Sequence, residues 1–125
     1  MIYGIGIDLV ENDRIEKIIN KWGEKFLSRV FSDREITYCE RHAGAFIHYG
    51  ARFAVKESFL KAIGTGLGRG VKLQEIEVVN EKSGKPEIRL SGGAQEFFVN
   101  AGIQQIHLSI THTKNYASAM VLLEK

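Results

Sequence analysis

The sequence predicts an α+β domain in which an antiparallel sheet packs against one long helix and several short helices. Three observations support this fold class. An alternating, β-branched segment opens the chain, helical patterns are grouped in its first half, and a series of strands fills its second half. The length of 125 residues fits one domain, residues 1–125, which can bury a core without disulfides or a structural metal.

The first predicted element is a strand over residues 2–9, and its two faces differ. One face carries bulky side chains, whereas the other carries Gly4, Gly6 and Asp8. Glycine inside a strand usually marks the close approach of another group, which here is either another backbone or a ligand. Asp8 lies at the end of the face that carries the two glycines. Its carboxylate needs hydrogen bonds or a cation because an unpartnered buried charge is costly. The structural alternative is that Asp8 braces a neighbouring turn.

The next two predicted elements are short helices, each introduced by a capping pattern. Asp13 and Glu16 have capping-box spacing at the start of a helix over residues 13–22, and Ser32 and Glu35 have the same spacing at the start of the second helix. One side of the first helix is basic. This stripe is either an ordinary solvated face or a surface that steers an acidic protein, and it consists of Arg14, Lys17, Lys21 and Lys25.

A long helix is predicted over residues 43–63. Within it Glu57 and Lys61 are four residues apart, so their side chains lie one above the other on one face. Gly50 and Ala54 share that face and are small, so we expect open space beside the pair. A carboxylate and an ammonium beside a vacant groove suit a metal ion and a phosphate, and the alternative is a solvated ion pair of little energetic weight.

Arg52 and Lys56 are also four residues apart, on a neighbouring side of the long helix. They are either solvated charges or a pair that holds an anion. Gly64 is expected to end the helix, because glycine readily adopts the left-handed conformation found just after many helices. A Gly64-Thr65-Gly66 turn follows.

The rest of the chain is predicted to be strands, with one further helix over residues 93–100. His112 ends one of these strands on its apolar side, a position more typical of a satisfied rim residue than of a catalyst. Asn115, in the tight turn after it, tolerates a positive φ. The predicted strands cover residues 71–80, 86–90, 105–112 and 116–123.

Composition excludes several classes of function. The net charge of +2 is too small to indicate a nucleic-acid-binding protein. No apolar run approaches the roughly 20 residues of a membrane span, and Asp8 interrupts the opening segment, so neither a membrane anchor nor a signal peptide is expected. A single cysteine, Cys39, cannot form an internal disulfide, so a reduced cytoplasm is the expected compartment.

Three segments, taken together and in order, form a specific pattern. They are Gly4–Glu11 with Arg14-Ile15, Arg52–Ala62 with Gly64-Thr65-Gly66, and Leu108–Thr113 with Tyr116-Ala117. Over essentially the whole chain, this pattern resembles the holo-acyl-carrier-protein synthases, the small 4′-phosphopantetheinyl transferases. Asn12 stands where this family often has an aliphatic residue, and Thr111 where serine is usual.

The resemblance implies a reaction. Enzymes of this family move the phosphopantetheine arm of coenzyme A onto a serine hydroxyl of apo acyl carrier protein, release adenosine 3′,5′-bisphosphate and serve fatty acid biosynthesis. They use Mg²⁺ and usually form trimers whose active sites lie between neighbouring subunits. We therefore expect the family's transferase fold and a magnesium-dependent enzyme, with coenzyme A as substrate and apo acyl carrier protein as partner, working as a homotrimer in the cytoplasm.

The resemblance also assigns residues. Asp8 and Glu57 match the family's metal ligands and form the expected catalytic group with Lys61, which contacts the phosphates. Arg14 matches an arginine that docks on the acidic helix of the carrier protein, and we expect Lys17 and Lys21 to widen that surface. The residues expected to bind coenzyme A are Arg52, Lys56, Lys61, Gly64, His112 and Thr113, of which Arg52, His112 and Thr113 match positions near the 3′-phosphate and the adenosine.

Some alternatives stay open at this stage. The base that takes the serine proton is either Glu57 itself or a metal-bound water held by Asp8 or Glu57. The chain as a whole could instead be a non-catalytic adaptor that binds an acidic protein through its basic stripe. A third possibility is a magnesium-dependent enzyme acting on another nucleotide, although neither a GxxxxGK[ST] nor a GxGxxG phosphate loop occurs in the sequence.

Overall fold

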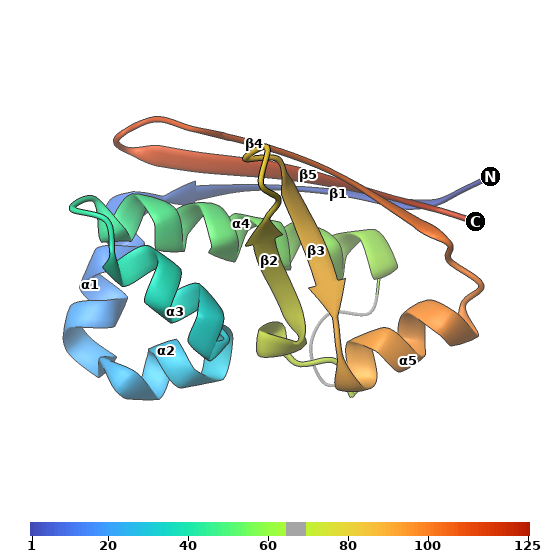
Figure 1. Cartoon of the computed structure of the whole chain (residues 1–125), viewed down its shortest axis with the longest axis horizontal. Helices are drawn as coiled ribbons and strands as arrows, with labels where there is room; N and C mark the ends of the chain where they lie inside the picture. Colours follow the sequence, from blue (N-terminus) through green and yellow to red (C-terminus); the bar gives the residue numbers. More distant parts are fainter. Residues whose placement is uncertain (65–69) are drawn as a thin grey trace.

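The computed structural model describes residues 1–64 and 70–125, which form a mixed α and β structure with antiparallel strands (Figure 1). Figure 1 shows the long helix α4 lying along a sheet, with the first three helices gathered at one end and α5 at the other. The elements are β1 (Ile2–Glu11), α1 (Asn12–Trp22), α2 (Glu24–Val30), α3 (Asp33–Glu40), α4 (Ala45–Ile63), the 3₁₀ helix η1 (Leu73–Glu75), β2 (Ile76–Asn80), β3 (Pro86–Leu90), α5 (Gly92–Asn100), β4 (Gln105–His112) and β5 (Tyr116–Glu124).

The described strands form two sheets rather than the single sheet that we predicted. Strands β1, β5 and β4 make a three-stranded antiparallel sheet in that order, and β2 pairs with β3 in a separate hairpin. The two sheets are separated because β3 and β4 are connected through α5 rather than through a tight turn. The chain ends meet beside this sheet, where the N–H of Lys125 donates to the carbonyl of Met1 over 2.8 Å.

Helix α4 is the centre of the molecule, and most of its 19 residues are buried. Its first half packs with apolar residues of α1, α2 and α3 in one core cluster. Its second half packs with residues of β2, α5 and β5 in another. A helix that is apolar on all sides is typical of such a central position. None of the described helices combines the length and apolarity that a bilayer span needs.

The backbone of α4 lies directly against the face of β1 that carries Gly4 and Gly6, which explains the absence of larger side chains there. A Cβ atom at Gly4 would lie 2.0 Å from the carbonyl oxygen of Ala62, and one at Gly6 would lie 1.8 Å from that of Ser58. Both carbonyls belong to α4, so strand and helix approach each other without a side chain between them. This contact fixes where β1, and therefore Asp8, lies relative to α4.

We predict that Gly6→Ala lowers the free energy of unfolding by about 3 kcal/mol, because the added methyl group requires β1 and α4 to separate. Urea unfolding monitored by circular dichroism measures this change. Gly44→Ala is the matched control, since a Cβ atom at Gly44 would come no closer than 3.4 Å to its neighbours. The control should lose less than about 1 kcal/mol, and equal losses in the two variants would contradict the close contact.

Several element boundaries differ from the predictions. Helix α1 begins at Asn12 after a Glu11 N-cap that makes no side-chain hydrogen bond, so the Asp13 capping box is wrong. The capping box of Ser32 and Glu35 is confirmed at the start of α3. The sequence did not predict α2, which follows a break at Gly23 with a φ of 54°. Lys25 therefore lies on α2 and not on the basic side of α1.

Two further predictions in the second half of the chain need correction. The strand predicted over residues 71–80 covers only Ile76–Asn80, because residues 73–75 form the 3₁₀ helix. Among the residues that the structure describes, every positive φ belongs to a glycine, so Asn115 does not use its tolerance for one. Instead, the hydroxyl of Thr113 accepts hydrogen bonds from the N–H groups of Asn115 and Tyr116 and shapes the turn. The predicted boundaries of β3 and β4 are confirmed.

Candidate active site

The end of β1 places Asp8 against α4, where Lys61 meets it. The Lys61 ammonium donates to the Asp8 carboxylate over 3.0 Å and to the carbonyl of Ile7 over 2.9 Å. The Lys61 side chain is 55% exposed, so solvent screens this pair and the ammonium can exchange partners at little cost. A sequence-predicted pair on one helix face thus gains a third member from the neighbouring strand.

Glu57 and Asp8 line the same cavity, which has a volume of about 340 Å³ and lies between β1, α1 and α4. Burial raises the pKa of Glu57, the negative charge of Asp8 raises it further, and Lys61 acts in the opposite direction. The charge of Asp8 is felt at Glu57 because the two carboxylates are neighbours across this cavity. Arg14 and Glu11 also line it, so one residue of the basic stripe opens onto the two acids.

This donor set fits a hard divalent cation. A cation between the two carboxylates would offset the repulsion that the negative charge of Asp8 exerts on Glu57. In the part of the chain that the structure describes, no third His, Cys, Asp or Glu completes a metal-binding cluster. That arrangement agrees with Mg²⁺ chemistry, because Mg²⁺ in substrate-phosphate sites typically takes one or two carboxylates and fills its other positions with water and phosphate oxygens.

We had predicted open space beside the small residues of α4, but in the structure this space is filled. A Cβ atom at Gly50 would lie 2.2 Å from the amide oxygen of Asn12, and Ala54 is completely buried. The Asn12 amide donates to the carbonyls of Thr113 and Lys114 over 3.4 and 3.0 Å. Asn12, which departs from the family pattern, thereby ties the start of α1 to the turn that carries Thr113. The sequence offered that departure as a signal, but not its meaning.

Lys56 does not reach the site, and its predicted role in binding coenzyme A is wrong. Its side chain is completely buried, and its ammonium donates to Glu35 over 2.7 Å. It also donates to the carbonyls of Leu73 and Ile76 over 2.9 and 2.7 Å. These bonds leave no face of the ammonium toward a ligand, so Lys56 joins α4 to α3 and to the region around β2.

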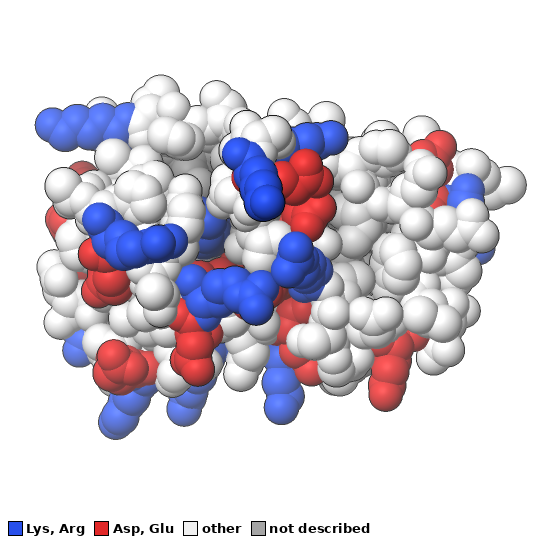
Figure 2. Space-filling view, in the orientation of Figure 1, with Lys and Arg blue, Asp and Glu red and all other residues white. Residues whose placement is uncertain are grey.

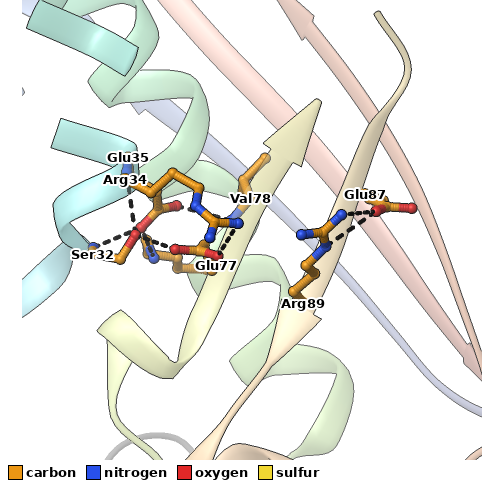
Figure 3. A network of polar contacts seen from close by, with 8 residues as sticks. Ser32, Arg34, Glu35, Glu77, Val78, Glu87 and Arg89 are labelled. Carbon is orange, nitrogen blue, oxygen red and sulfur yellow. Dashed lines mark hydrogen bonds and ion pairs between the residues drawn. The ribbon is translucent and has the colours of Figure 1, made fainter. Parts of the chain in front are cut away.

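Glu35 is the centre of the network shown in Figure 3. Its carboxylate accepts hydrogen bonds from the N–H groups of Ser32 and Val78 over 3.0 and 2.9 Å, in addition to that from Lys56. Ser32 in turn donates its hydroxyl to Glu77, which also pairs with Arg34 at 3.7 Å. A buried ion pair with all of these partners is well solvated by protein groups, which offsets its desolvation.

Arg52, His112 and Thr113 are not among the residues that line the cavity of the two acids. The Arg52 guanidinium donates to the side chain of Asn80 in β2 over 2.9 Å. His112 ends β4, which is separated from β1 by the whole width of β5. Within one chain, the residues predicted for coenzyme A therefore fall into two groups, one on the β1 side of α4 and one on the side of β2 and β4.

The remaining predicted residues lie near these groups. Gly64 adopts the expected left-handed conformation, with a φ of 78°, and its N–H closes α4 on the carbonyl of Leu60. Thr65 and Gly66, which complete the predicted turn, lie outside the described residues. Lys17 and Lys21 are exposed on α1 beyond Arg14, and the Lys21 ammonium lies 5.2 Å from the ring centroid of Trp22.

Charged side chains of both signs are mixed on the face shown in Figure 2, and most gather over the half that holds α2, α3 and the β2–β3 hairpin. On this face Arg34 pairs with Glu77, and Arg89 pairs with Glu87 at 3.3 Å. The pairing reduces the net field of the surface, which agrees with the overall charge of +2.

Comparisons with known proteins converge on one family. A family model described as the 4′-phosphopantetheinyl transferase superfamily matches residues 4–121. The holo-[acyl-carrier-protein] synthase of Syntrophus aciditrophicus is 50% identical over 124 residues, which are 99% of this chain and 97% of that protein. The crystal structure of a holo-[acyl-carrier-protein] synthase from Neisseria meningitidis aligns with a TM-score of 0.93 at 32% identity, covering 100% of both chains.

A further solved structure carries a ligand. It is a holo-(acyl-carrier-protein) synthase from Bacillus anthracis in complex with CoA (3′,5′-ADP). It is 37% identical to this chain, with a TM-score of 0.81, and the alignment covers 99% of this chain and 97% of that one. The three alignments cover at least 97% of each chain compared.

Proposed function

Because the chain belongs to the 4′-phosphopantetheinyl transferase superfamily, as one of its holo-[acyl-carrier-protein] synthases, we propose that the cavity holding Asp8 and Glu57 is its catalytic centre. The enzyme transfers the 4′-phosphopantetheine arm of coenzyme A to a serine hydroxyl of apo acyl carrier protein and releases adenosine 3′,5′-bisphosphate. The observation that carries the site proposal is that the two acids and Arg14 open onto one cavity, with Lys61 at its edge.

Asp8 and Glu57 are the residues that would hold Mg²⁺ in this cavity. When bound, Mg²⁺ neutralises negative charge on the phosphate oxygens of coenzyme A. Lys61 exchanges the Asp8 carboxylate for a phosphate oxygen, which its exposed side chain and weak surface pair allow. The substrate phosphates are therefore held by groups from β1 and from α4, on the wall where Gly4 and Gly6 fix the separation of these two elements.

The transfer forms one bond and breaks another. The serine oxygen attacks the phosphorus that bears the pantetheine arm, and the bond from that phosphorus to the departing adenosine 3′,5′-bisphosphate breaks. Glu57 accepts the serine proton, either directly or through a water molecule, and its raised pKa brings the carboxylate closer to the range of an effective base. The contribution of the protein is thus positional and electrostatic, as is usual for phosphoryl-type transfer.

The function is tested by weighing the product. The protein is mixed with Mg²⁺, coenzyme A and an apo acyl carrier protein, and the carrier is analysed by intact-mass spectrometry. Addition of one phosphopantetheine group is the expected result. Loss of phosphate from free nucleotide would indicate a different magnesium enzyme, and an unchanged carrier would indicate a non-catalytic adaptor.

We further propose that the reaction occurs in the cytoplasm and serves fatty acid biosynthesis, in keeping with a free, buried thiol at Cys39.

We propose that the carrier protein docks on α1. Arg14 joins the exposed α1 surface to the cavity of Asp8 and Glu57, so a partner held by Arg14 brings its serine close to both acids. Lys17 and Lys21 continue the positive surface along the helix. An acidic partner helix is attracted to such a surface and oriented by it.

Arg14→Glu is expected to weaken carrier binding by about 10- to 100-fold, because it replaces an attractive charge with a repulsive one. Coenzyme A binding should stay unchanged. Surface plasmon resonance with immobilised apo carrier and calorimetry with coenzyme A measure the two affinities. Arg29→Glu makes the same change of charge on α2, outside this cavity, and serves as the control. An unaltered affinity of Arg14→Glu for the carrier would refute the docking role.

The working unit is proposed to be a homotrimer with composite sites. The outer face of the three-stranded sheet is apolar and exposed, and its residues include the register partners Ile7 and Met120, which are 62% and 44% exposed. Burial of such a face against other copies is favourable. A neighbouring subunit could then bring its Arg52, His112 and Thr113 to the far end of a coenzyme A held by Asp8 and Glu57, which the single chain keeps apart.

Complementation tests the composite site. Glu57→Gln and His112→Ala subunits should each transfer slowly alone, because each lacks one half of every site. Random co-expression of the two variants should recover about a quarter of wild-type activity, since about three quarters of the trimers are mixed and each mixed trimer combines two intact halves in one of its three sites. Native mass spectrometry verifies that mixed trimers form. Mixed trimers that stay as slow as the parent variants would show that each site lies within one chain.

A further inference from the structure

Lys61 is the cationic side chain that contacts Asp8 in the structure. Its ammonium donates to the Asp8 carboxylate over 3.0 Å and to the carbonyl oxygen of Ile7, the preceding residue, over 2.9 Å. Two acceptors on one strand therefore hold the ammonium beside the cavity of Asp8 and Glu57. The ion pair of Lys61 is with Asp8 of β1, although Glu57 lies one turn earlier on its own helix.

The two members of this ion pair differ in exposure. The Asp8 side chain is 18% exposed, whereas that of Lys61 is 55% exposed. The carboxylate is thus largely enclosed by protein, and the ammonium reaches it from the solvent side. Solvent screening weakens such a pair, so Lys61 can leave Asp8 when another anion offers it a position. As long as Lys61 stays, one oxygen of Asp8 accepts a hydrogen bond from a positively charged group.

The charge of Lys61 acts on both acids that we propose as ligands of a divalent cation. Burial raises the pKa of Glu57, the negative charge of Asp8 raises it further, and Lys61 lowers it. The other charged residues that line the cavity, Glu11 and Arg14, have opposite signs and offset each other. Lys61 therefore cancels one of the two negative charges that Asp8 and Glu57 present to an incoming cation.

A positively charged neighbour opposes the binding of a divalent ion in two ways. The ion has to replace the ammonium at the Asp8 carboxylate, and the two cations repel each other at short range. An anion with several oxygens removes both obstacles, because it gives the exposed ammonium a new acceptor and supplies further ligands to the ion. The pyrophosphate group of coenzyme A is an anion of this kind.

We propose that Lys61 competes with the divalent cation for Asp8, so that the protein binds the ion weakly alone and tightly together with the pyrophosphate of coenzyme A. The identity of the anion rests on the proposed function. Lys61 thereby selects the complex of ion and substrate over the free ion, in addition to contacting the phosphates. Because coupling between two ligands is reciprocal, the ion strengthens coenzyme A binding by the same factor. The alternative is a solvated surface pair without influence on the ion.

Titration with Mn²⁺ tests the competition directly. Mn²⁺ takes the same oxygen ligands as Mg²⁺, and electron paramagnetic resonance measures its free concentration. Without coenzyme A, Lys61→Met should bind Mn²⁺ about tenfold more tightly than the wild type, because a charge that repels the ion is gone. Lys61→Arg retains the charge and should bind the ion as weakly as the wild type. Glu57→Gln should weaken the binding, which assigns the bound ion to this cavity.

The same titrations with coenzyme A measure the coupling. The gain in Mn²⁺ affinity on addition of coenzyme A should be about tenfold smaller in Lys61→Met than in the wild type, since only the direct contact of ion and phosphate remains. Lys82→Met removes a positive charge from the exposed turn between β2 and β3 and serves as the control, with wild-type affinity and coupling. A Lys61→Met protein that binds Mn²⁺ no more tightly than the wild type, or that retains the full coupling, would overturn the proposal.

Lysine footprinting of the wild type gives a second measurement that does not depend on any variant. Saturating Mg²⁺ alone should increase the acylation of Lys61 by an amine-reactive ester, because the ammonium is released from Asp8. Addition of coenzyme A with Mg²⁺ should then protect Lys61, while the acylation of Lys82 stays constant. Acylation of Lys61 that is unchanged by saturating Mg²⁺ would also overturn the proposal.

The outcome is separable from that of the transferase assignment. Tighter Mn²⁺ binding by Lys61→Met, in a protein whose wild type never modifies a carrier, would refute the proposed function and retain the competition. A wild type that modifies the carrier, together with unchanged Mn²⁺ binding in Lys61→Met, would retain the function and refute this inference. Where both hold, Lys61→Met should combine a tighter bound ion with slower transfer, a pair of effects that a merely structural lysine would not produce.

Discussion

Glu57→Gln is expected to lower the rate of phosphopantetheine transfer at least 100-fold while the protein stays folded. The amide has nearly the same shape as the carboxylate, but it carries no charge and cannot accept the serine proton. Loss of one preorganised electrostatic group in an active site typically costs about 10²–10³ in turnover. Intact-mass measurement of the carrier over time gives the rate, and circular dichroism verifies the fold. Glu96→Gln, on the exposed surface of α5, is the control and should transfer at the wild-type rate.

The pH dependence of wild-type turnover gives a further test of the role of Glu57. Burial and the charge of Asp8 both raise the pKa of Glu57, so turnover should increase with pH as Glu57 loses its proton. More Mg²⁺ favours the charged carboxylate, and the rising limb should therefore move to lower pH as the Mg²⁺ concentration increases. Two results would refute the proposal that Glu57 holds the metal. One is a rising limb of the pH profile that stays at the same pH at every Mg²⁺ concentration, and the other is full turnover in Glu57→Gln.

Lys56→Met should lower the free energy of unfolding by about 3–5 kcal/mol, because it leaves the Glu35 carboxylate buried without its cation. Urea unfolding at pH 7 measures the loss. The double variant Lys56→Met, Glu35→Gln should recover part of the loss, since no buried charge remains.

Lys82→Met provides the control, because Lys82 is exposed in the turn between β2 and β3 and its loss should cost less than about 0.5 kcal/mol. A loss below about 1 kcal/mol for Lys56→Met would mean that Glu35 is solvated well enough by Ser32 and Val78 alone. Transfer activity of folded Lys56→Met distinguishes a structural role from substrate binding. The KM for coenzyme A should be unchanged if the ammonium never reaches the ligand.

The sequence correctly predicted those features of the fold that depend on residues close together in the chain. The Ser32–Glu35 capping box and the limits of β3 and β4 are of this kind, because hydrogen bonds or side-chain alternation within a few residues decide them. Helix α2 was not predicted, since its seven residues are too few for a clear helical period and it starts at a glycine. Asp13 failed as a cap because Asn12, held by the distant Thr113–Asn115 turn, begins the helix one residue earlier.

In the candidate site too, the sequence did not reveal features that depend on residues far apart in the chain. Asp8 and Glu57 were proposed as neighbours from a resemblance, and the structure brings both to one cavity. Lys56 and Lys61 have identical side chains on one helix, yet one is completely buried and the other is 55% exposed. The difference comes from Glu35, twenty-one residues earlier, and no pattern along α4 reveals it.

The contact between β1 and α4 has a consequence for engineering this enzyme. Carbonyl oxygens of the helix occupy the space that a Cβ atom of Gly4 or Gly6 would need, so main-chain atoms set how closely β1, which carries Asp8, approaches the helix that carries Glu57. Substitutions elsewhere in the core have no side chain at this junction through which to widen or narrow the proposed Mg²⁺ site. Attempts to change its preference among divalent ions should therefore exchange the ligands themselves, and directed evolution of the surrounding residues should leave that preference constant.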